Sequence, residues 1–438
     1  MDQSKRGVVD NFGYQKLVSV KLFEGGLVMN IWQEMQVENL KFQGVDFPEF
    51  KSRQIGGVEV LSVTDSTIGL GKIQCVFQRY VSGRGVPLVE SALSEMLGME
   101  SGFQDKMDTL GADFSFSANR DFVFVSIVAL TDQLTKAWDL FMEELQNPRF
   151  SQSRLDVWKK QQEEVEKITW SKGKAIASKK IKADVLAQFP QYADTHLHNC
   201  SSSIQLPEME SALGQLWQNL LFLGFSGNVP EALEEKVLQN ANQKNAVPTP
   251  VSFLTKPWEM PELELEQTSM RCAQIVPNKK DANFPMLYWT NILLAGFFGS
   301  RLNKVIREEK GLSYGVHGGF VHHQNVSYWN IQSEIKKGSE AEVKAILEHE
   351  MANLHTTITA EEFNKAQSYV AGNISMQFDS PFAVFDMLLN EILTGGNAPT
   401  IKTRWNNIFG ITHDQFVESS KNAPYALTGF KSLFLGEE

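Results

Sequence analysis

An arginine and a tyrosine, Arg307 and Tyr314, stand seven positions apart (314 − 307 = 7) in the stretch "SRLNKVIREEKGLSYGVHGGF". This stretch predicts a short helix that stops at Gly311 and continues as a strand, with Arg307 on the last helical turn and Tyr314 among the first strand residues. Arginine offers a permanently charged fork of donors, and a phenol donates one further hydrogen bond. A glycine cap would let both side chains point into one space. The alternative is a solvated arginine and a half-buried core tyrosine.

The eight histidines give little support for a metal site. A helical zinc pair needs histidines at i and i+4, but His349 and His355 in "HEMANLH" are six apart (355 − 349 = 6). At about 100° per residue they lie on different helix faces. The segment His196–Cys200, "HLHNC", has two imidazoles and a thiol without a second ligand pair, which favours a loop. His322 and His323 fall at a predicted hairpin turn.

Composition argues against several functional classes. The chain has 438 residues and a net charge of −11, so nucleic acid and anionic lipid are poor candidates for the main partner. No run approaches the roughly 18 apolar residues of a membrane span. The basic segment Ser171–Asp184 is interpreted as a solvated loop or helix face.

Cys75, Cys200 and Cys272 lie far apart, which predicts buried free thiols. The sequence contains no nucleophile elbow, phosphate loop or dinucleotide fingerprint.

The order of predicted elements occurs twice along the chain. The first half begins with two predicted strands and the second with one, and each continues as an apolar helix, a short helix, a glycine, two strands and two helices. Gly111 and Gly311 occupy matching places 200 residues apart (311 − 111 = 200). Thr359 and Glu362 predict a capping box at the start of the last helix of this pattern. The sequence therefore predicts an α+β protein, a tandem of two similar domains, each an antiparallel sheet faced by helices.

The predicted domain limits follow from a proline-rich interruption. The segment 246–262, "AVPTPVSFLTKPWEMPE", carries four prolines and is the best candidate for a linker. We expect a first domain at 1–245 and a second at 263–438.

The segment "GSRLNKVIREEKGLSYGV" resembles the second-domain signature of the pitrilysin/insulinase family of zinc peptidases, in its bacterial two-domain, processing-peptidase-like branch. The resemblance covers most of the chain from about Arg53 onward. It implies half of a metallopeptidase clamshell in which two similar units close around a chamber. One unit of such a pair carries zinc on an HxxEH helix, and an Arg and a Tyr spaced like Arg307 and Tyr314 bind the substrate and stabilise the transition state.

The family's zinc helix falls at "PLVESALSEMLGM", where the motif is degenerate. Ser91 stands in place of the first histidine, Ser94 in place of the general-base glutamate, and Glu95 in place of the second histidine. A serine hydroxyl is a poor zinc ligand and cannot take a proton from the attacking water. The family's distal acidic ligand would come from one of three glutamates, Glu163, Glu164 or Glu166.

The resemblance implies a zinc-less, substrate-binding subunit of a heterodimeric metallopeptidase, inactive alone. A homologous HxxEH-bearing subunit would supply the zinc, with pairing of two identical copies as a variant. The substrate would be a short or unfolded peptide, bound as an added strand at the counterpart of the family's receiving edge, "ADFSFSA" (112–118). Phe114 and Phe116 there are more simply one buried strand face.

Two other functions stay open. The chain is otherwise an inactive homologue that acts as a scaffold or peptide-binding protein in a larger assembly, or a stand-alone enzyme that uses "HLHNC". The first fifteen residues show no apolar signal-peptide core, and the cysteine usage fits the bacterial cytoplasm or periplasm.

Overall fold

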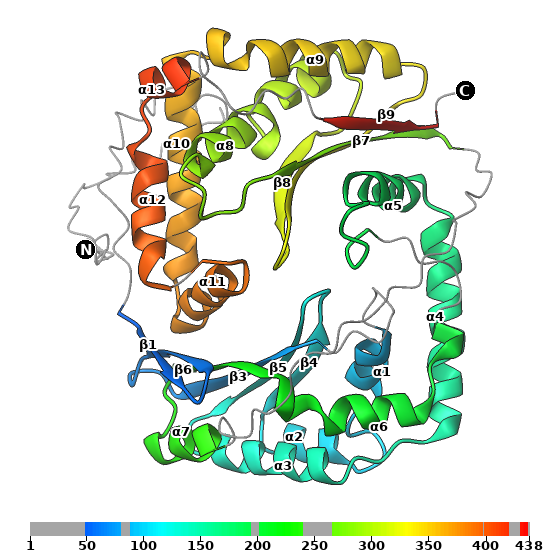
Figure 1. Ribbon diagram of the computed structural model, residues 1–438, viewed down its shortest axis with the longest axis vertical. Coiled ribbons are helices and arrows are strands. Elements are labelled where there is room, and N and C mark those ends of the chain that lie inside the picture. Colours follow the sequence, from blue (N-terminus) through cyan, green and yellow to red (C-terminus); the bar gives the residue numbers. More distant parts are fainter. Residues whose placement is uncertain are drawn as a thin grey trace, which may run out of the picture. The chain divides into compact units, whose positions relative to one another are not determined.

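The computed structural model describes residues 49–79, 88–193, 201–239, 265–396, 398–419 and 430–436 (Figure 1). All of these residues fall within one compact unit, Phe42–Glu438. The predicted linker 246–262 lies outside the described residues, so the domain limits at 245 and 263 stay predictions. Among the described helices, none combines the length and the apolar character that a membrane crossing needs.

The first half forms a six-stranded sheet in the order β1-β2-β6-β3-β5-β4. Most neighbouring strands are antiparallel, but β2 and β6 run parallel, so the prediction of a purely antiparallel sheet is wrong here. The chain reaches β6 only after a helical crossover, which lets it re-enter the sheet in the parallel direction. The strands are β1 (Lys51–Ile55), β2 (Val58–Thr64), β3 (Leu70–Gln78), β4 (Asp113–Ala118), β5 (Phe122–Leu130) and β6 (Leu220–Gly227).

Strand β3 is buried along most of its length because both faces of this sheet are covered. Cys75 and Phe77 lie in the core formed with the helices of the first half, whereas Val76 lies in a second core with α11 (Pro381–Leu393). Successive strand side chains point to opposite faces, which explains the nearly continuous apolar run. The helices of the first core are α1 (Leu88–Met96), α2 (Phe103–Thr109), α3 (Leu134–Gln146), α4 (Gln152–Trp170), α6 (Leu206–Gly214) and α7 (Glu231–Leu238).

The second half forms a four-stranded sheet in the order β10-β7-β9-β8, and all its pairings are antiparallel, as predicted. Its strands are β7 (Gln267–Val276), β8 (His317–His322), β9 (Ser327–Lys336) and β10 (Lys431–Leu435). The helices that pack in its core are α8 (Phe284–Asn291), α9 (Glu340–Thr357), α10 (Ala360–Ser375), α12 (Ile401–Gly410) and α13 (His413–Ser419). Short 3-10 turns are η1 (Ser201–Ser203), η2 (Leu216–Asn219), η6 (Met376–Phe378) and η7 (Ala398–Thr400).

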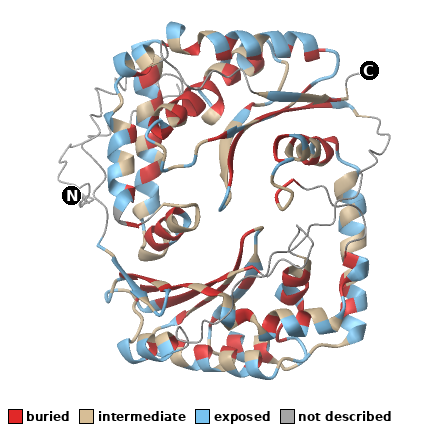
Figure 2. Ribbon diagram, viewed as in Figure 1, coloured by how far each residue is buried: buried red, intermediate tan, exposed pale blue. Residues whose placement is uncertain are grey.

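Each half lends one helix to the sheet of the other. Helix α5 (Gly173–Val185), from the first half, packs against β7 and β10, and α11 packs against β2 and β6 (Figure 2). The interpretation of the basic segment 171–184 as a solvated loop or helix face is therefore wrong. Ile176 and Ala177 are fully buried, and Lys179 is only 5% exposed with its ammonium 4.4 Å from the Trp170 ring centre. Lysine can bury its aliphatic stem in this way, so local charge did not reveal the packed face.

Several local predictions are confirmed. Gly111 and Gly311 both adopt left-handed backbone, with φ of 61° and 63°. Thr359 and Glu362 form the capping box at α10, in which each side chain bonds the other residue's backbone N–H. Cys75 and Cys272 are buried free thiols, and Cys200 lies outside the described residues.

Candidate functional site

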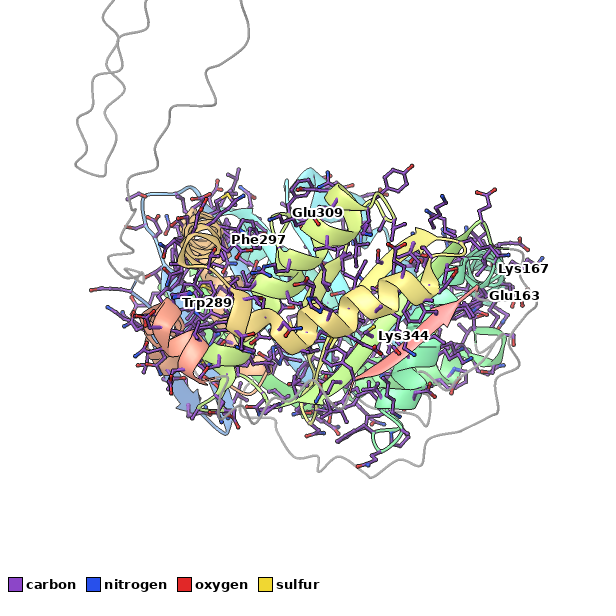
Figure 3. All side chains as sticks on the ribbon, turned by 90° about the horizontal axis from the view of Figure 1, so that it is seen from above. Glu163, Lys167, Trp289, Phe297, Glu309 and Lys344 are labelled. Carbon is purple, nitrogen blue, oxygen red and sulfur yellow. The ribbon has the colours of Figure 1, made fainter. Side chains whose placement is uncertain are left out.

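Arg307 lies on a π-helix, η5 (Asn303–Glu309), which follows a second π-helical segment, η4 (Ile292–Gly296). Phe297, just after η4, and Glu309, the last residue of η5, are labelled in Figure 3. The N–H of Leu312 donates back across Gly311 to the carbonyl of Ile306 at 2.9 Å, so the glycine closes the helix end as expected. Wide helical turns of this kind are frequent at functional sites.

Tyr314 lies in a bend before β8, so the prediction that it occupies the first strand residues is wrong. Ser313 makes an isolated bridge to Ile335, and β8 itself begins at His317. The residues after Gly311 are needed to cross from the helix to the sheet, which delays the start of the strand. The Tyr314 side chain is 91% exposed, which excludes the alternative of a half-buried core tyrosine.

Buried Asn303 fixes the Tyr314 turn to the Arg307 helix. Its Nδ2 donates to the carbonyl of Val316 at 2.8 Å, and its Oδ1 accepts from the N–H of Val316 at 2.8 Å. The same Nδ2 lies 3.1 Å from the carbonyl of Phe297, before the helix. Asn303 is 3% exposed, so these bonds form away from water and hold the turn firmly.

Ser313 holds the other side of the turn. Its Oγ lies 2.6 Å from Ser333 Oγ on β9 and 2.9 Å from the carbonyl of Glu334, and it accepts from the N–H of Gly315 at 3.1 Å. Tyr314 therefore lies between Ser313 and Val316, both of which are held by hydrogen bonds. These hydrogen bonds hold the backbone of the turn in place while the Tyr314 phenol stays exposed.

Arg307 is not a freely solvated charge. Its guanidinium carbon lies 3.8 Å from the centre of the Phe298 ring, and its side chain is 29% exposed. Nη1 lies 3.5 Å from a carboxylate oxygen of Glu308, the next residue along the chain. Within the described contacts, no bond joins Arg307 to Tyr314. Both side chains keep donors for a ligand.

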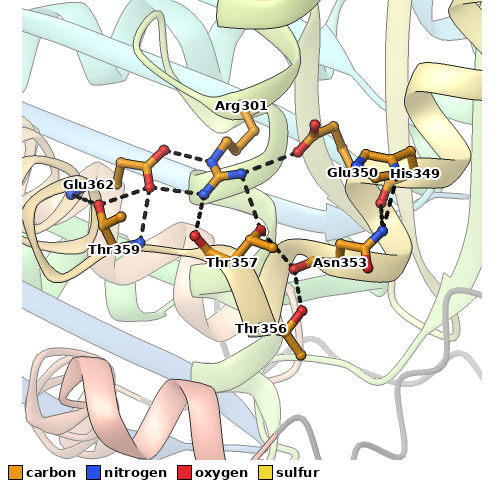
Figure 4. A network of polar contacts seen from close by, with 8 residues as sticks. All are labelled: Arg301, His349, Glu350, Asn353, Thr356, Thr357, Thr359 and Glu362. Atoms are coloured by element: carbon orange, nitrogen blue, oxygen red, sulfur yellow. Dashed lines mark hydrogen bonds and ion pairs between the residues drawn. The ribbon is translucent and has the colours of Figure 1, made fainter.

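A second arginine of the segment, Arg301, has a structural role (Figure 4). Its guanidinium bonds Glu362 at 2.6 and 2.9 Å, the carbonyl of Thr357 at 2.8 Å and Glu350 at 3.4 Å. These partners lie on α9 and α10, so Arg301 ties the start of the helical segment to both helices. The bidentate geometry is the strong form of an arginine–carboxylate pair.

The three residues matched to the family's zinc motif, Ser91, Ser94 and Glu95, lie on the helix α1. Ser91 is partly buried, whereas Ser94 and Glu95 are exposed. Their neighbour Glu90 is buried and paired with Arg79 at 2.9 Å. Among the described residues, no three His, Cys, Asp or Glu side chains gather as a metal ion would require.

Glu95 borders an apolar pocket of about 380 Å³ between α1 and α4. Its lining consists of Glu95, Met96, Met99, Ser153, Arg154, Val157, Trp158 and Gln161. Thioether, aliphatic and indole groups predominate, and these are not ligands that zinc prefers. The candidate distal ligands Glu163, Glu164 and Glu166 all lie on α4, where Glu164 pairs with Lys167 at 2.5 Å.

Strand β4, the predicted peptide-receiving strand, stands at the end of the six-stranded sheet next to β5. Phe116 is buried and Phe114 packs against Phe103 and Phe141, with ring centres 5.0 and 5.6 Å apart. The interpretation of the two phenylalanines as one buried face is therefore confirmed. In the described part of the chain, the other edge of β4 pairs with no strand, so its backbone groups can receive one.

The histidine candidates lie in separate environments. His349 is exposed on α9, while His355 stacks on Phe416 with ring centres 4.6 Å apart. His322 ends β8 before the β8–β9 turn, and its burial, with nearby Lys279 and Arg404, lowers its pKa to about 3. His323 lies 3.4 Å from Asp121. The "HLHNC" segment lies outside the described residues.

Comparison with known proteins relates part of this chain to the M16 peptidases. The sequence model described as "Peptidase M16 inactive domain" matches residues 219–370, which include Arg307 and Tyr314. No curated protein matches the chain. The peptidase M16 inactive domain from Pseudomonas fluorescens shares the fold with a TM-score of 0.72 and 19% identity, over 89% of this chain and 98% of that one.

Two further solved structures share the fold at lower identity. The periplasmic protease PqqL from Escherichia coli gives a TM-score of 0.68 and 13% identity, over 97% of this chain and 49% of that one. A chain of complex III from Candida albicans, with Inz-5 bound, gives 0.64 and 14%, over 88% and 95%. Residues 219–370 of this chain thus match the M16 inactive-domain model, and the chain shares the fold of a solved M16 inactive domain.

Proposed function

We propose that this chain is the zinc-less, substrate-binding subunit of a heterodimeric M16 metallopeptidase that cleaves short or unfolded peptides. The observation that carries the proposal is the exposure of Tyr314. A phenol that is 91% exposed, on a turn held by buried polar residues, has no role in this chain's own core. A rigidly presented exposed aromatic is typical of a residue that contacts a ligand or partner.

The degenerate α1 motif supports a missing metal half. With serines at positions 91 and 94 and a carboxylate at 95, α1 offers no imidazole at the family's two histidine positions and no base at its glutamate position. We propose that a homologous HxxEH-bearing subunit supplies the zinc and activates the water. This chain would contribute Arg307 and Tyr314 in trans, and the open edge of β4 would bind peptide backbone.

Arg307 and Tyr314 have distinct roles in this proposal. The arginine fork binds a carbonyl or carboxylate of the peptide. The phenol donates to the oxyanion that forms when water attacks the scissile carbonyl. One such donor contributes about 3 kcal/mol to transition-state stabilisation. Loss of either donor is expected to lower turnover by at least tenfold.

The test is reconstitution with the partner. The chain is purified from its host with whatever binds it, zinc is measured in each separated subunit, and peptide cleavage is assayed before and after recombination. We expect zinc only in the partner and cleavage only in the pair. Lys304→Ala, an exposed cation on the same helix as Arg307, is the matched control and should keep full turnover. Zinc at one per chain in this subunit, or cleavage by it alone, contradicts the proposal.

The fold shared with a complex III chain favours one alternative, a scaffold in a larger assembly. In that case neither Arg307 nor Tyr314 would affect any cleavage, and the chain would be captured with structural subunits that lack HxxEH. Recovery of an HxxEH-bearing homologue in the same capture favours the peptidase subunit instead. The two outcomes separate the functions without any assumption about the substrate.

A further inference from the structure

Two adjacent phenylalanines between η4 and η5, Phe297 and Phe298, differ in how far they are exposed to solvent. The Phe297 ring is partly buried and packs against Tyr369, with ring centres 5.1 Å apart. Phe298 is 65% exposed. A large apolar ring left in water loses the stabilisation that burial would give it, and such a side chain often has a binding role.

The exposed ring carries the Arg307 guanidinium on its face. The 3.8 Å between the guanidinium carbon and the ring centre is a stacking distance, well inside the range of a cation–π contact. Stacking covers one face of the guanidinium plane but leaves the N–H donors at its edge available. An arginine held flat in this way loses less rotamer freedom when it binds a planar oxygen pair.

The ring and the arginine are joined by a fixed backbone. The carbonyl of Phe297 accepts from Asn303 Nδ2 and from the N–H of Ser300, both at 3.1 Å. Asn303 is the first residue of the helix that carries Arg307. The same asparagine bonds both backbone groups of Val316, two residues after Tyr314. The platform, the arginine and the tyrosine turn are therefore held by one buried side chain.

We propose that Phe298 is a positioning residue of the peptide-binding site: its ring holds the Arg307 guanidinium with its donor edge ready for a carboxylate or carbonyl oxygen of the peptide. This inference rests on the proposed function, because Arg307 must bind peptide for its orientation to matter. Phe298 touches no reacting atom in this account. It acts through the guanidinium alone.

The first test is spectroscopic and needs no partner. A proton above an aromatic ring face is shifted upfield by the ring current, so the Arg307 Nε–Hε resonance of the full chain should be upfield of ordinary arginines. Phe298→Tyr should keep the shift, and Phe298→Leu should abolish it. Met376→Ala, which removes another exposed apolar side chain, should leave it unchanged. An ordinary Arg307 resonance in the unmodified chain overturns the proposal.

The second test uses the reconstituted pair and a peptide substrate. Phe298→Leu should raise KM roughly two- to five-fold with little change in kcat, the factor that an exposed cation–π contact contributes. Phe298→Tyr should restore KM, which a role in packing alone does not predict. If Arg307→Ala impairs the pair and Phe298→Leu does not, the positioning role is wrong while the proposed function stands. If Arg307→Ala has no effect, the proposed function itself fails.

Discussion

Replacing Asn303 with alanine should loosen the Tyr314 turn. In the folded chain the asparagine side chain bonds both the N–H and the carbonyl of Val316, each at 2.8 Å, and Val316 is fully buried. Alanine leaves both backbone groups without these bonds. The Phe297 carbonyl keeps a second donor, the N–H of Ser300 at 3.1 Å, so it is not stranded.

The magnitude follows from the two stranded groups. A buried backbone group that loses its partner costs about 1–3 kcal/mol, so two of them lower the free energy of unfolding by about 2–6 kcal/mol. The assays are chemical denaturation of the full chain and amide hydrogen exchange at Val316. We expect faster exchange at Val316 in Asn303→Ala. Lys304→Ala, exposed on the same helix, should change stability by less than about 0.5 kcal/mol.

A loss below about 1 kcal/mol, with unchanged exchange at Val316, would refute the reasoning. Such a result would mean that the turn is held chiefly from its other side, through Ser313 and Ser333. The double replacement Ser313→Ala with Asn303→Ala would then show whether the two supports substitute for each other. Couplings of 0.5–3 kcal/mol are usual for residues of one hydrogen-bond network.

Three further predictions concern stability and can be checked by denaturation. Burial lowers the pKa of Lys279 to about 8 despite its ion pair with Glu391, and Glu391 also pairs with Arg404, so Lys279→Met should stabilise the chain at pH 7. The folded-state pKa lies below the ordinary 10.5, so the gain should be full below about pH 8 and fade as the pH rises toward 10.5. Gly311→Ala and its counterpart Gly111→Ala should each lower the free energy of unfolding by about 1–2 kcal/mol, because alanine is strained at positive φ. The loss should not be larger, since there is open space for a Cβ at both positions. Gly224→Ala should cost about 1–3 kcal/mol, because its Cβ would lie 2.0 Å from Phe385 of α11, and Phe385→Leu should relieve part of this.

The sequence was informative wherever the controlling interaction is local. Period-two and helical patterns predicted many of the strands and helices of both halves, but not β6, β10 or α11. Gly111 and Gly311 predicted left-handed helix ends because few other residues adopt that backbone. The capping box at Thr359 needed only a three-residue spacing. These features depend on neighbours within one or two turns.

Interactions between distant segments could not be predicted in this way. The parallel pairing of β2 with β6 and the exchange of α5 and α11 between the halves depend on contacts that no local pattern records. The basic stretch that forms α5 was misread because Lys179 buries its stem beside Trp170. Burial of that kind is set by the partner surface.

In the candidate site, too, the sequence predicted the local features and missed those that depend on contacts with other residues. Spacing placed Arg307 and Tyr314 across a glycine, but it gave no information on the exposure of the phenol or on the stacked Phe298 ring. Asn303 was missed because an asparagine within a helix carries no distinctive signal. Its low helix propensity, at a position where a better helix former would be expected, was the one available hint.

The most direct test of the central claim is the turnover of a peptide by the reconstituted pair carrying Tyr314→Phe, which removes one hydroxyl and keeps the ring. Zinc content and pair formation are measured on the same sample, so that only the chemical step differs. The account predicts an intact, zinc-loaded pair whose kcat falls by at least tenfold. An unchanged kcat in such a pair would contradict the assignment of Tyr314 to the active site.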